Sequence, residues 1–369
     1  MQVVIDASPL LVRSAGVKNY LYYWIEHLRG AAGADAIRTL PHLPPQNGLR
    51  HDSSIAGRIR TTRGLATLAV ANYTPLPVLD LLTRGADAFH ASVLVHRPPS
   101  RTRVTATIHD LTCFLLPELH PAANLRAERS FAEILRRADG LIAVSQSTRN
   151  DAVRVLGIPP EKITVIHSGV ADAFFECTPK DAGMARLKYR LERPFVLFVG
   201  TIEPRKNVDL LLDAFAALPA ELRAGYDLVV AGPVGWKSDA TLKRLHGARY
   251  LGYVPEPDLA PLTAAATVFA YPSLYEGFGF PVAQAMAAGV AVVTSNVSSL
   301  PEVAGDAALL VDPRSESELR DALQTLLTQP ALRAALSAAG RARSERFRWK
   351  ECAAQSLRFF QETIGSSRQ

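Results

Sequence analysis

Cysteines and long hydrophobic runs are scarce in this sequence. Its 369 residues include three cysteines, Cys113, Cys177 and Cys352, without the spacing of a metal site or a disulfide framework. No apolar run approaches the roughly 20 residues that a membrane-spanning helix needs. The first residues, MQVVIDASPLL, lack the basic start and the long apolar segment of a secretory signal. The simplest expectation is a cytoplasmic protein.

The excess of positive over negative residues is confined to the first half of the chain. Residues 1–170 contain 19 Lys and Arg against 13 Asp and Glu, which accounts for the whole formal charge of +6. The arginines form three groups: Arg50, Arg58, Arg60 and Arg63; Arg97, Arg101 and Arg103; and Arg126, Arg129, Arg136 and Arg137. No recognition motif or aromatic platform accompanies them, which argues against nucleic-acid binding. A solvated surface and a contact with anionic lipid headgroups remain the two interpretations.

The sequence is typical of a globular protein with two domains. Its length exceeds that of one ordinary core, and its 48% apolar and 21% charged residues are usual proportions. Short apolar runs alternate with amphipathic runs, which predicts parallel sheets covered by helices. Strands are expected at 3–6, 88–91, 104–108, 140–144, 164–166, 195–199, 227–231, 250–251, 268–271, 290–294 and 308–311.

The helical runs complete a prediction of two α/β domains. Helices are expected at 17–29, 64–83, 123–137, 146–156, 206–218, 239–246, 256–265, 282–288, 315–327, 330–345 and 349–363, and residues 41–63 are expected to form a mobile loop. The predicted domains are doubly wound and Rossmann-like, at 1–170 and 195–345, and face each other across a cleft. Residues 171–194 are the predicted linker. Residues 346–369 are expected to hold a helix that crosses back to the first domain.

The loop after Tyr271 combines a carboxylate with glycines. Glu276 is followed by Gly277 and Gly279, and Pro281 then opens an amphipathic run, as proline prefers the first turn of a helix. A glycine-rich loop that leads into a helix presents backbone N–H groups to a polar or anionic ligand. A carboxylate beside it accepts hydrogen bonds from hydroxyls. The combination suits a sugar attached to a diphosphate.

A second loop presents two cations. Gly200 ends the strand 195–199, and Arg205 and Lys206 follow just before a helix. Cations at a helix N-terminus oppose the helix dipole, so the pair indicates a nearby anion, such as a leaving nucleoside diphosphate. The alternative is a solvated pair without a role.

Residues 271–312 resemble the signature of family-4 glycosyltransferases, which are retaining enzymes of the two-Rossmann (GT-B) fold. In that family two glutamates are separated by seven residues. Here the first is Glu276, and Gln284 stands at the second position. The resemblance implies that the first residue touches the donor sugar and that the second holds the ribose. Glutamine cannot supply a charged acceptor, so weaker donor binding or an inactive relative are the alternatives.

The same resemblance gives roles to further residues. It implies catalytic roles for His109, which follows the strand 104–108, and for Glu276, Arg205 and Lys206. His109 could equally be structural, and Asp110 either orients it or caps the next turn. Asn19 and Tyr20 are expected on a helix surface without a role. The implied donor-binding residues are Gly16, Gly200, Arg205, Lys206, Val254, Glu276, Gly277, Phe278, Gly279 and Gln284.

The predicted function is a retaining transfer of a hexose from a nucleotide-diphosphate sugar to a glycan, lipid-linked or small-molecule acceptor. The run VTATIHDLTCFLLPE resembles bacterial mannosyl- and rhamnosyltransferases, which favours a GDP-mannose-type donor. No Asp-x-Asp occurs, so neither a metal nor another cofactor is expected. The predicted location is the cytoplasm, including the inner face of the membrane. The rival functions are a nucleotide-sugar epimerase of the same fold and a non-catalytic binding subunit, which Gln284 favours.

Overall fold

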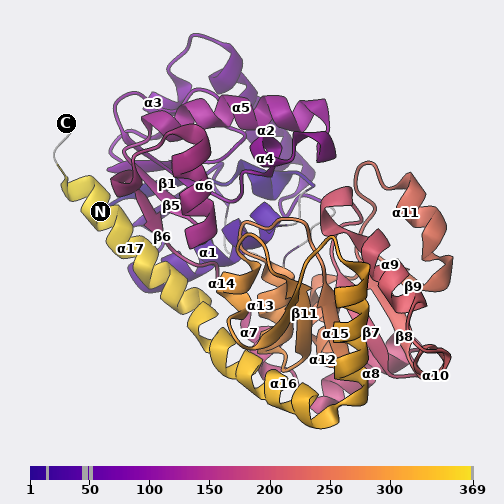
Figure 1. Cartoon of the computed structure of the whole chain (residues 1–369). Helices are drawn as coiled ribbons and strands as arrows, with labels where there is room; N and C mark the ends of the chain where they lie inside the picture. Colours follow the sequence, from indigo (N-terminus) through magenta and orange to yellow (C-terminus); the bar gives the residue numbers. More distant parts are fainter. Residues whose placement is uncertain (14–15, 44–48, 50–52, 367–369) are drawn as a thin grey trace. The chain divides into compact units, whose positions relative to one another are not determined.

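Two parallel sheets of six strands each form the framework of the protein (Figure 1). The computed structural model describes residues 1–13, 16–43, 49 and 53–366. The chain divides into two compact units: unit 1 comprises residues 1–169 and 349–369, and unit 2 comprises residues 170–348. Both units are helix-covered parallel sheets, as the alternation of strands and helices predicted.

The sheet of unit 1 runs in the order β2-β1-β3-β4-β5-β6, and all of its strand pairs are parallel. Its strands are β1 (Val3–Asp6), β2 (Ile37–Leu40), β3 (Ala88–Ala91), β4 (Arg103–Ile108), β5 (Gly140–Ala143) and β6 (Ile163–Val165). The central strands β1 and β3 are buried along their whole length. They read as continuous apolar runs because helices cover both faces of the sheet.

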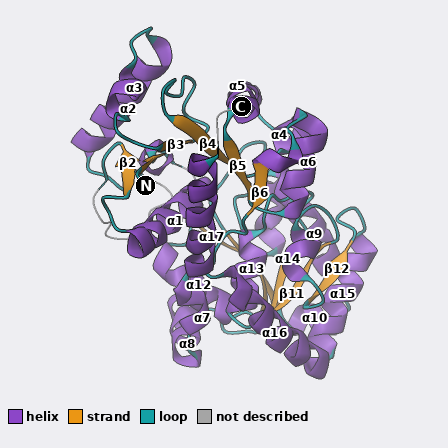
Figure 2. Cartoon of the chain, turned by 90° about the vertical axis from the view of Figure 1, so that its left-hand side faces the viewer, coloured by secondary structure: helices purple, strands orange, loops and turns teal. Residues whose placement is uncertain are grey.

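The helices of unit 1 include one from each end of the chain. They are α1 (Gly16–Ala32), α2 (Arg58–Tyr73), α3 (Val78–Leu82), α4 (Thr112–Leu115), α5 (Ala122–Arg137), α6 (Gln146–Leu156) and α17 (Trp349–Gly365). Helix α17 packs along α1 (Figure 2). The indole of Trp24 on α1 donates a hydrogen bond of 2.9 Å to Ser356 on α17. The C-terminal helix therefore belongs to the core of unit 1.

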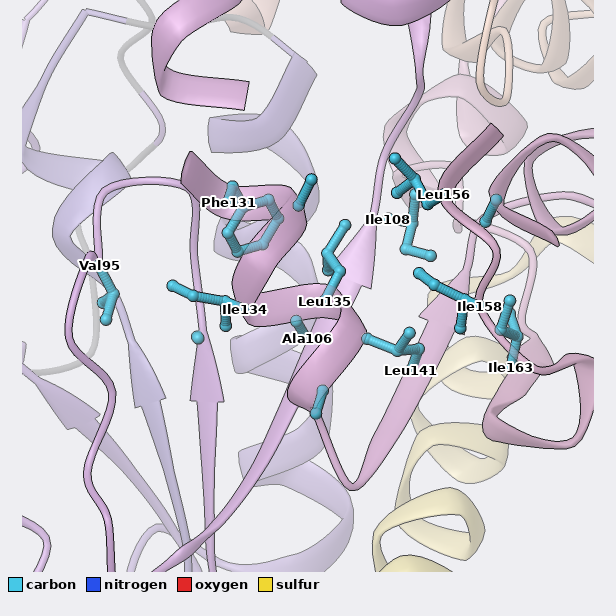
Figure 3. Close-up of a cluster of buried hydrophobic side chains, with 14 of the residues drawn as sticks. Val95, Ala106, Ile108, Phe131, Ile134, Leu135, Leu141, Leu156, Ile158 and Ile163 are labelled. Atoms are coloured by element: carbon cyan, nitrogen blue, oxygen red, sulfur yellow. The ribbon is translucent and has the colours of Figure 1, made fainter. Parts of the chain in front are cut away.

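A cluster of buried apolar side chains fills the space between the sheet of unit 1 and helices α5 and α6. Figure 3 shows Phe131, Ile134 and Leu135 from α5 beside Ala106 and Ile108 from β4. These α5 residues lie three or four positions apart, so they form one face of the helix. Their packing fixes α5 beside the carboxyl end of β4.

The sheet of unit 2 repeats the parallel arrangement, in the order β12-β11-β10-β7-β8-β9. Its strands are β7 (Phe195–Val199), β8 (Asp227–Ala231), β9 (Arg249–Gly252), β10 (Val268–Tyr271), β11 (Ala291–Ser295) and β12 (Ala308–Val311). Its helices are α7 (Asp172–Glu176), α8 (Pro179–Lys188), α9 (Val208–Ala216), α10 (Ala220–Gly225), α11 (Asp239–Arg244), α12 (Glu256–Ala264), α13 (Phe280–Ala287), α14 (Leu300–Ala304), α15 (Glu316–Thr328) and α16 (Pro330–Ser344). In this order β10 lies between β7 and β11.

Several features differ from the expectations. The edge strand β2 was not predicted. Part of the expected loop 41–63 is helical, because α2 begins at Arg58, and the expected helix 64–83 is divided between α2 and α3. Asn19 and Tyr20 are both buried, so their expected place on a helix surface is wrong. Trp349 of α17 covers Tyr20, with ring centroids 5.6 Å apart. Arg50 of the first arginine group lies outside the described residues.

Candidate active site

The candidate site of unit 2 is built from loops at the carboxyl ends of three adjacent strands. The loop after β7 carries Arg205 and Lys206, and the loop after β10 carries Glu276. Leu274 donates a backbone hydrogen bond of 2.9 Å to the carbonyl of Arg205. The loop after β11 joins them through Ser298, whose hydroxyl accepts a hydrogen bond of 2.9 Å from the backbone of Glu276. Ligands of open parallel sheets bind at this edge.

The carboxylate of Glu276 is buried and surrounded by donors. One oxygen accepts hydrogen bonds from Lys206 (2.6 Å), Ser273 (2.7 Å) and Tyr271 (3.0 Å), and the other accepts one of 2.9 Å from Arg205. Burial alone would raise the pKa of this carboxyl group, but Arg205 and Lys206 outweigh it and hold the pKa at about 2. Glu276 is therefore ionised at neutral pH.

Arg205 and Lys206 are neutralised by side chains of their own unit. Arg205 also donates to Glu203 at 2.9 Å, so two cations face two carboxylates. The side chains of Arg205 and Lys206 are only 13% and 11% exposed, which does not fit the solvated alternative. Burial and the neighbouring Arg205 lower the pKa of Lys206, against the opposing effect of Glu276 and Glu203. The anion that the sequence led us to expect beside this pair is present within the chain itself.

The glycine-rich turn is shaped by one position. Gly279 has a φ of +95°, a conformation that favours glycine, and a Cβ atom there would lie 2.8 Å from Leu300. Helix α13 starts at the next residue, Phe280. Pro281 has no N–H group, and the N–H groups of Val282 and Ala283 donate to the carbonyl of Gly279 at 3.1 and 3.2 Å. What this helix start offers to an anionic group is therefore the positive end of its dipole. Phe278 is buried against Phe280 and Phe347, with ring centroids 5.4 and 5.5 Å apart, so it can offer a ligand only its backbone.

Gln284 lies on α13 and is partly buried. Its side-chain amide makes no hydrogen bond with any residue that the structure describes. The amide is therefore free to both donate to and accept from a ligand. This is the position at which the family signature has its second glutamate.

The loops after β7 and β8 approach each other closely. A Cβ atom on Gly232, which has a φ of +141°, would lie 1.9 Å from the carbonyl oxygen of Gly200. The close approach requires glycine at residue 232. Val254, which follows β9, is buried, so it offers backbone rather than side chain to a ligand.

His109 and Gly16 belong to unit 1 rather than to this network. His109 follows β4, and its ring meets Tyr20 edge to face with centroids 4.9 Å apart. Burial lowers the pKa of His109 to about 4, against the opposing effect of Asp110. The imidazole is therefore neutral at pH 7. Asp110 caps the next turn, since it accepts hydrogen bonds from the backbone and hydroxyl of Thr112 at 3.0 and 2.6 Å. Gly16 is the first residue of α1.

Sequence reasoning did not identify the residues that hold Glu276 and Arg205 in place. These are Tyr271, Ser273 and Ser298 around Glu276 and Glu203 beside Arg205. Ser273 precedes Glu276 by three residues, a spacing that brings two side chains together in a tight loop. Tyr271 gives no such signal because it ends an apolar strand.

Among the residues that the structure describes, no group of three or more His, Cys, Asp and Glu side chains could hold a metal ion. Within the same residues, no helix has both the length and the apolar character needed to cross a membrane.

Family profiles of glycosyltransferases match both halves of the chain. Residues 16–174 match the profile of Glycosyltransferase Family 4, and residues 180–343 match that of Glycosyl transferases group 1. The chain is 36% identical to O-antigen chain mannosyltransferase B of Escherichia coli, over 97% of this chain and 98% of that protein. It is 30% identical to the serotype-specific mannosyltransferase WbdA of Escherichia coli over 85% of this chain, and it spans only 40% of WbdA.

Solved structures with the same fold are more distant in sequence. Sucrose-phosphate synthase from Thermosynechococcus elongatus has a TM-score of 0.75 and 21% identity, with both chains covered completely. Anabaena Alr3699/HepE in complex with UDP and glucose has a TM-score of 0.74 and 20% identity over 98% of this chain and all of that one. Identities at this level establish the fold alone. Together with the profiles and the relative that matches over nearly its whole length, they show that this chain belongs to the family-4, or group 1, glycosyltransferases of the GT-B fold.

Proposed function

We propose that the chain transfers mannose from GDP-mannose to a growing glycan, with retention of the anomeric configuration and without a metal ion. The observation that carries the proposal is the network around Glu276, in which Arg205, Lys206 and the start of α13 meet at one sheet edge. The names of the mannosyltransferase relatives support mannose as the sugar and an O-antigen-type glycan as the acceptor.

In this proposal each part of the network has a chemical task. The N-terminal end of α13 attracts the diphosphate through the positive end of the helix dipole. Lys206 and Arg205 hold Glu276 at a fixed position and stabilise charge on the leaving phosphate. Glu276 accepts a hydrogen bond from a sugar hydroxyl through Oε2, which accepts a hydrogen bond from no described residue other than Arg205. Gly200, Gly277 and the backbone at Val254 and Phe278 complete the donor site, together with Gln284 on the ribose.

His109 and Gly16 are proposed to serve the same donor from unit 1. His109 is neutral, and neither of its ring nitrogens has a hydrogen-bond partner among the described residues. A neutral imidazole can donate from one nitrogen and accept at the other, which suits a sugar hydroxyl. Gly16 leaves open space where a side chain would stand, since an added Cβ atom would meet nothing within 4 Å.

The test is transfer by the purified chain with four donors: GDP-mannose, UDP-glucose, UDP-N-acetylglucosamine and ADP-glucose. A mannose-terminated oligosaccharide serves as the acceptor, and NMR of the product reports the anomeric configuration. We expect transfer from GDP-mannose alone, an α-linked product, and the same rate with a chelator present. Transfer from another donor, or a β-linked product, would overturn the corresponding part of the proposal. An epimerase would release free nucleotide or a new sugar without the acceptor, and a binding subunit would bind the donor without turnover.

We further propose that helix α5 brings the enzyme to anionic membranes. Arg126 and Arg129 on α5 are exposed and form no ion pair with any described residue. Arg136 on the same helix is instead paired with Glu133 at 2.5 Å. Sedimentation with anionic phosphatidylglycerol vesicles should exceed that with neutral phosphatidylcholine vesicles and fall as salt rises. Two outcomes would refute a role of α5 in membrane binding. One is equal binding to both kinds of vesicle, and the other is unchanged binding to anionic vesicles in a variant with Arg126→Glu and Arg129→Glu.

A further inference from the structure

A pocket opens in unit 1 beside His109. It lies at the carboxyl ends of β1, β3 and β4, where it is closed by α1 and α5. The polar residues that line it are Asp6, His90, Ser92, Thr107, His109, Asp110 and Glu128. Its apolar wall includes Ile108, Phe131 and Leu135, which Figure 3 shows in the buried cluster between α5 and the sheet. The pocket is therefore bounded by the packed core of unit 1.

Most polar groups of this pocket are already engaged. Asp6 accepts hydrogen bonds from the hydroxyls of Ser8 and Ser92. His90 contacts the hydroxyls of Thr105 and Thr107, each at 3.0 Å. One oxygen of Asp110 is occupied by Thr112. These groups shape the pocket and have little capacity left for a ligand.

Glu128 differs from the other polar residues of the pocket because its carboxyl group is not engaged by the described residues. It comes from α5, on the turn before Phe131, and its carboxyl group forms no hydrogen bond or ion pair with any residue that the structure describes. Burial and the nearby carboxylate of Asp110 raise the pKa of Glu128 to about 7. A partly buried carboxyl group without a protein partner keeps its oxygens available to water or to a ligand. Together with the second oxygen of Asp110, it offers free acceptors to a ligand in the pocket.

The charge of the pocket limits what can bind there. Its lining includes three carboxyl groups, no lysine and no arginine, and both histidines are neutral because burial lowers their pKa values to about 3 and 4. A phosphate or carboxylate ligand would be repelled. Hydroxyl groups of a neutral sugar are compatible with the pocket, since the cavity of about 60 Å³ has room for hydroxyls that reach in from its mouth and hydroxyls donate to carboxylate oxygens.

We propose that Glu128 and Asp110 bind hydroxyl groups of the acceptor sugar, and that the acceptor therefore ends in a neutral sugar rather than in a phosphate or a uronic acid. This inference rests on the proposed transferase function and specifies its acceptor. Glu128 is a specificity-determining residue in this assignment. It is ionised above pH 7, so binding of the acceptor should tighten as the pH rises through 7.

Glu128→Gln tests the proposal, with Glu133→Gln on the exposed side of the same helix as the matched control. The measurements are the KM for a mannose-terminated oligosaccharide and for GDP-mannose between pH 6 and 8. We expect Glu128→Gln to raise the acceptor KM about tenfold at pH 8, as for a lost hydrogen bond to a charged group, and to raise it far more than the donor KM. The pH dependence of the acceptor KM should disappear in this variant and persist in Glu133→Gln.

A second arm uses the same oligosaccharide ended in a glucuronic acid. The wild type should discriminate against it, and Glu128→Gln should reduce that discrimination, which a purely structural role would not do. A rise confined to the donor KM would assign the pocket to the transferred sugar and overturn the proposal. If the wild type transfers mannose and Glu128→Gln keeps its acceptor KM, only the role of Glu128 fails. If the wild type transfers nothing from any donor, the proposed function itself fails.

Discussion

The ring of Tyr20 meets the ring of His109 edge to face, with centroids 4.9 Å apart. Tyr20 is fixed in turn by Trp349 and Trp24, at 5.6 and 5.3 Å between centroids. The candidate catalytic histidine thus rests on a buried aromatic stack and on no hydrogen bond among the described residues. Packing, rather than a polar partner, determines its orientation.

Removing this aromatic support should impair turnover. We expect Tyr20→Leu to lower kcat by about tenfold or more, because a small displacement of a reacting group is costly. Tyr20→Phe keeps the ring and loses only the hydroxyl, which lies 3.5 Å from that of Thr107, so its kcat should stay near that of the wild type. Steady-state kinetics on variants with intact far-UV circular dichroism decides the matter. Equal kcat values for the two variants would mean that Tyr20 does not position His109.

Lys206 should matter for both folding and turnover. Lys206→Met leaves the buried Glu276 with a single cation, and breaking a buried pair costs about 3–5 kcal/mol of unfolding free energy. Loss of a preorganised charge also lowers the rate by about 100- to 1,000-fold. Arg244→Met, which removes exposed pairs with Asp209 and Asp213, is the control and should cost less than about 1 kcal/mol for each pair. Urea denaturation of both variants compares them directly, and similar midpoints would contradict a structural role for the Lys206 pair.

The depressed pKa of Glu276 predicts a specific dependence of stability on pH. Because the folded-state pKa of about 2 lies below the ordinary value of 4.5, the ionised group stabilises the fold at pH values above 4.5. This contribution, about 3 kcal/mol for such a shift, is lost as the pH falls from 4.5 toward 2. Glu276→Gln should therefore differ most from the wild type at pH 6, and the difference should fall to roughly half at pH 3 and largely vanish near pH 2. A constant difference between the two unfolding free energies would show that Glu276 does not titrate in this range.

Gln284→Glu should increase affinity for the donor. The amide of Gln284 has no partner among the described residues, so nothing in that part of the chain opposes a carboxylate there. A hydrogen bond to a charged group contributes about 1.5–3 kcal/mol against about 1 for a neutral pair, which corresponds to roughly a tenfold lower Kd. Calorimetric titration of the wild type and of Gln284→Glu with GDP-mannose measures the two Kd values. An unchanged Kd would remove residue 284 from the donor site.

Local patterns were sufficient to predict most of the fold. Buried strands such as β7 and β10 are continuous apolar runs, and their bounds were predicted to the residue. The edge strand β2 was missed because only Ile37 and Thr39 are buried, and Arg38 between them is not. Helix α2 was predicted to start too late, since its first turn carries two arginines and is exposed. Elements covered on one face only leave a weaker pattern in the sequence.

The contacts of the site depend on information that no local pattern holds. Arg205 and Glu276 are 71 residues apart and meet because β10 pairs with β7. The sequence indicated that each loop carries chemistry but not that the cations and the carboxylate neutralise one another. Tyr20 was misjudged for the same reason, since the side chain that buries it, Trp349, lies at the other end of the chain.

The pairing of α1 with α17 has a consequence for synthesis on the ribosome. Unit 2 is one continuous stretch, whereas unit 1 is completed only when Trp349 and the residues after it have been made. At the usual 5–20 residues per second, the apolar face of α1 stays uncovered for about ten to forty seconds while unit 2 is translated. During that interval the nascent chain exposes Trp24 and Tyr20, which makes this face the natural point of contact for a chaperone. Unit 1 thus begins to leave the ribosome before unit 2 but completes its fold after it.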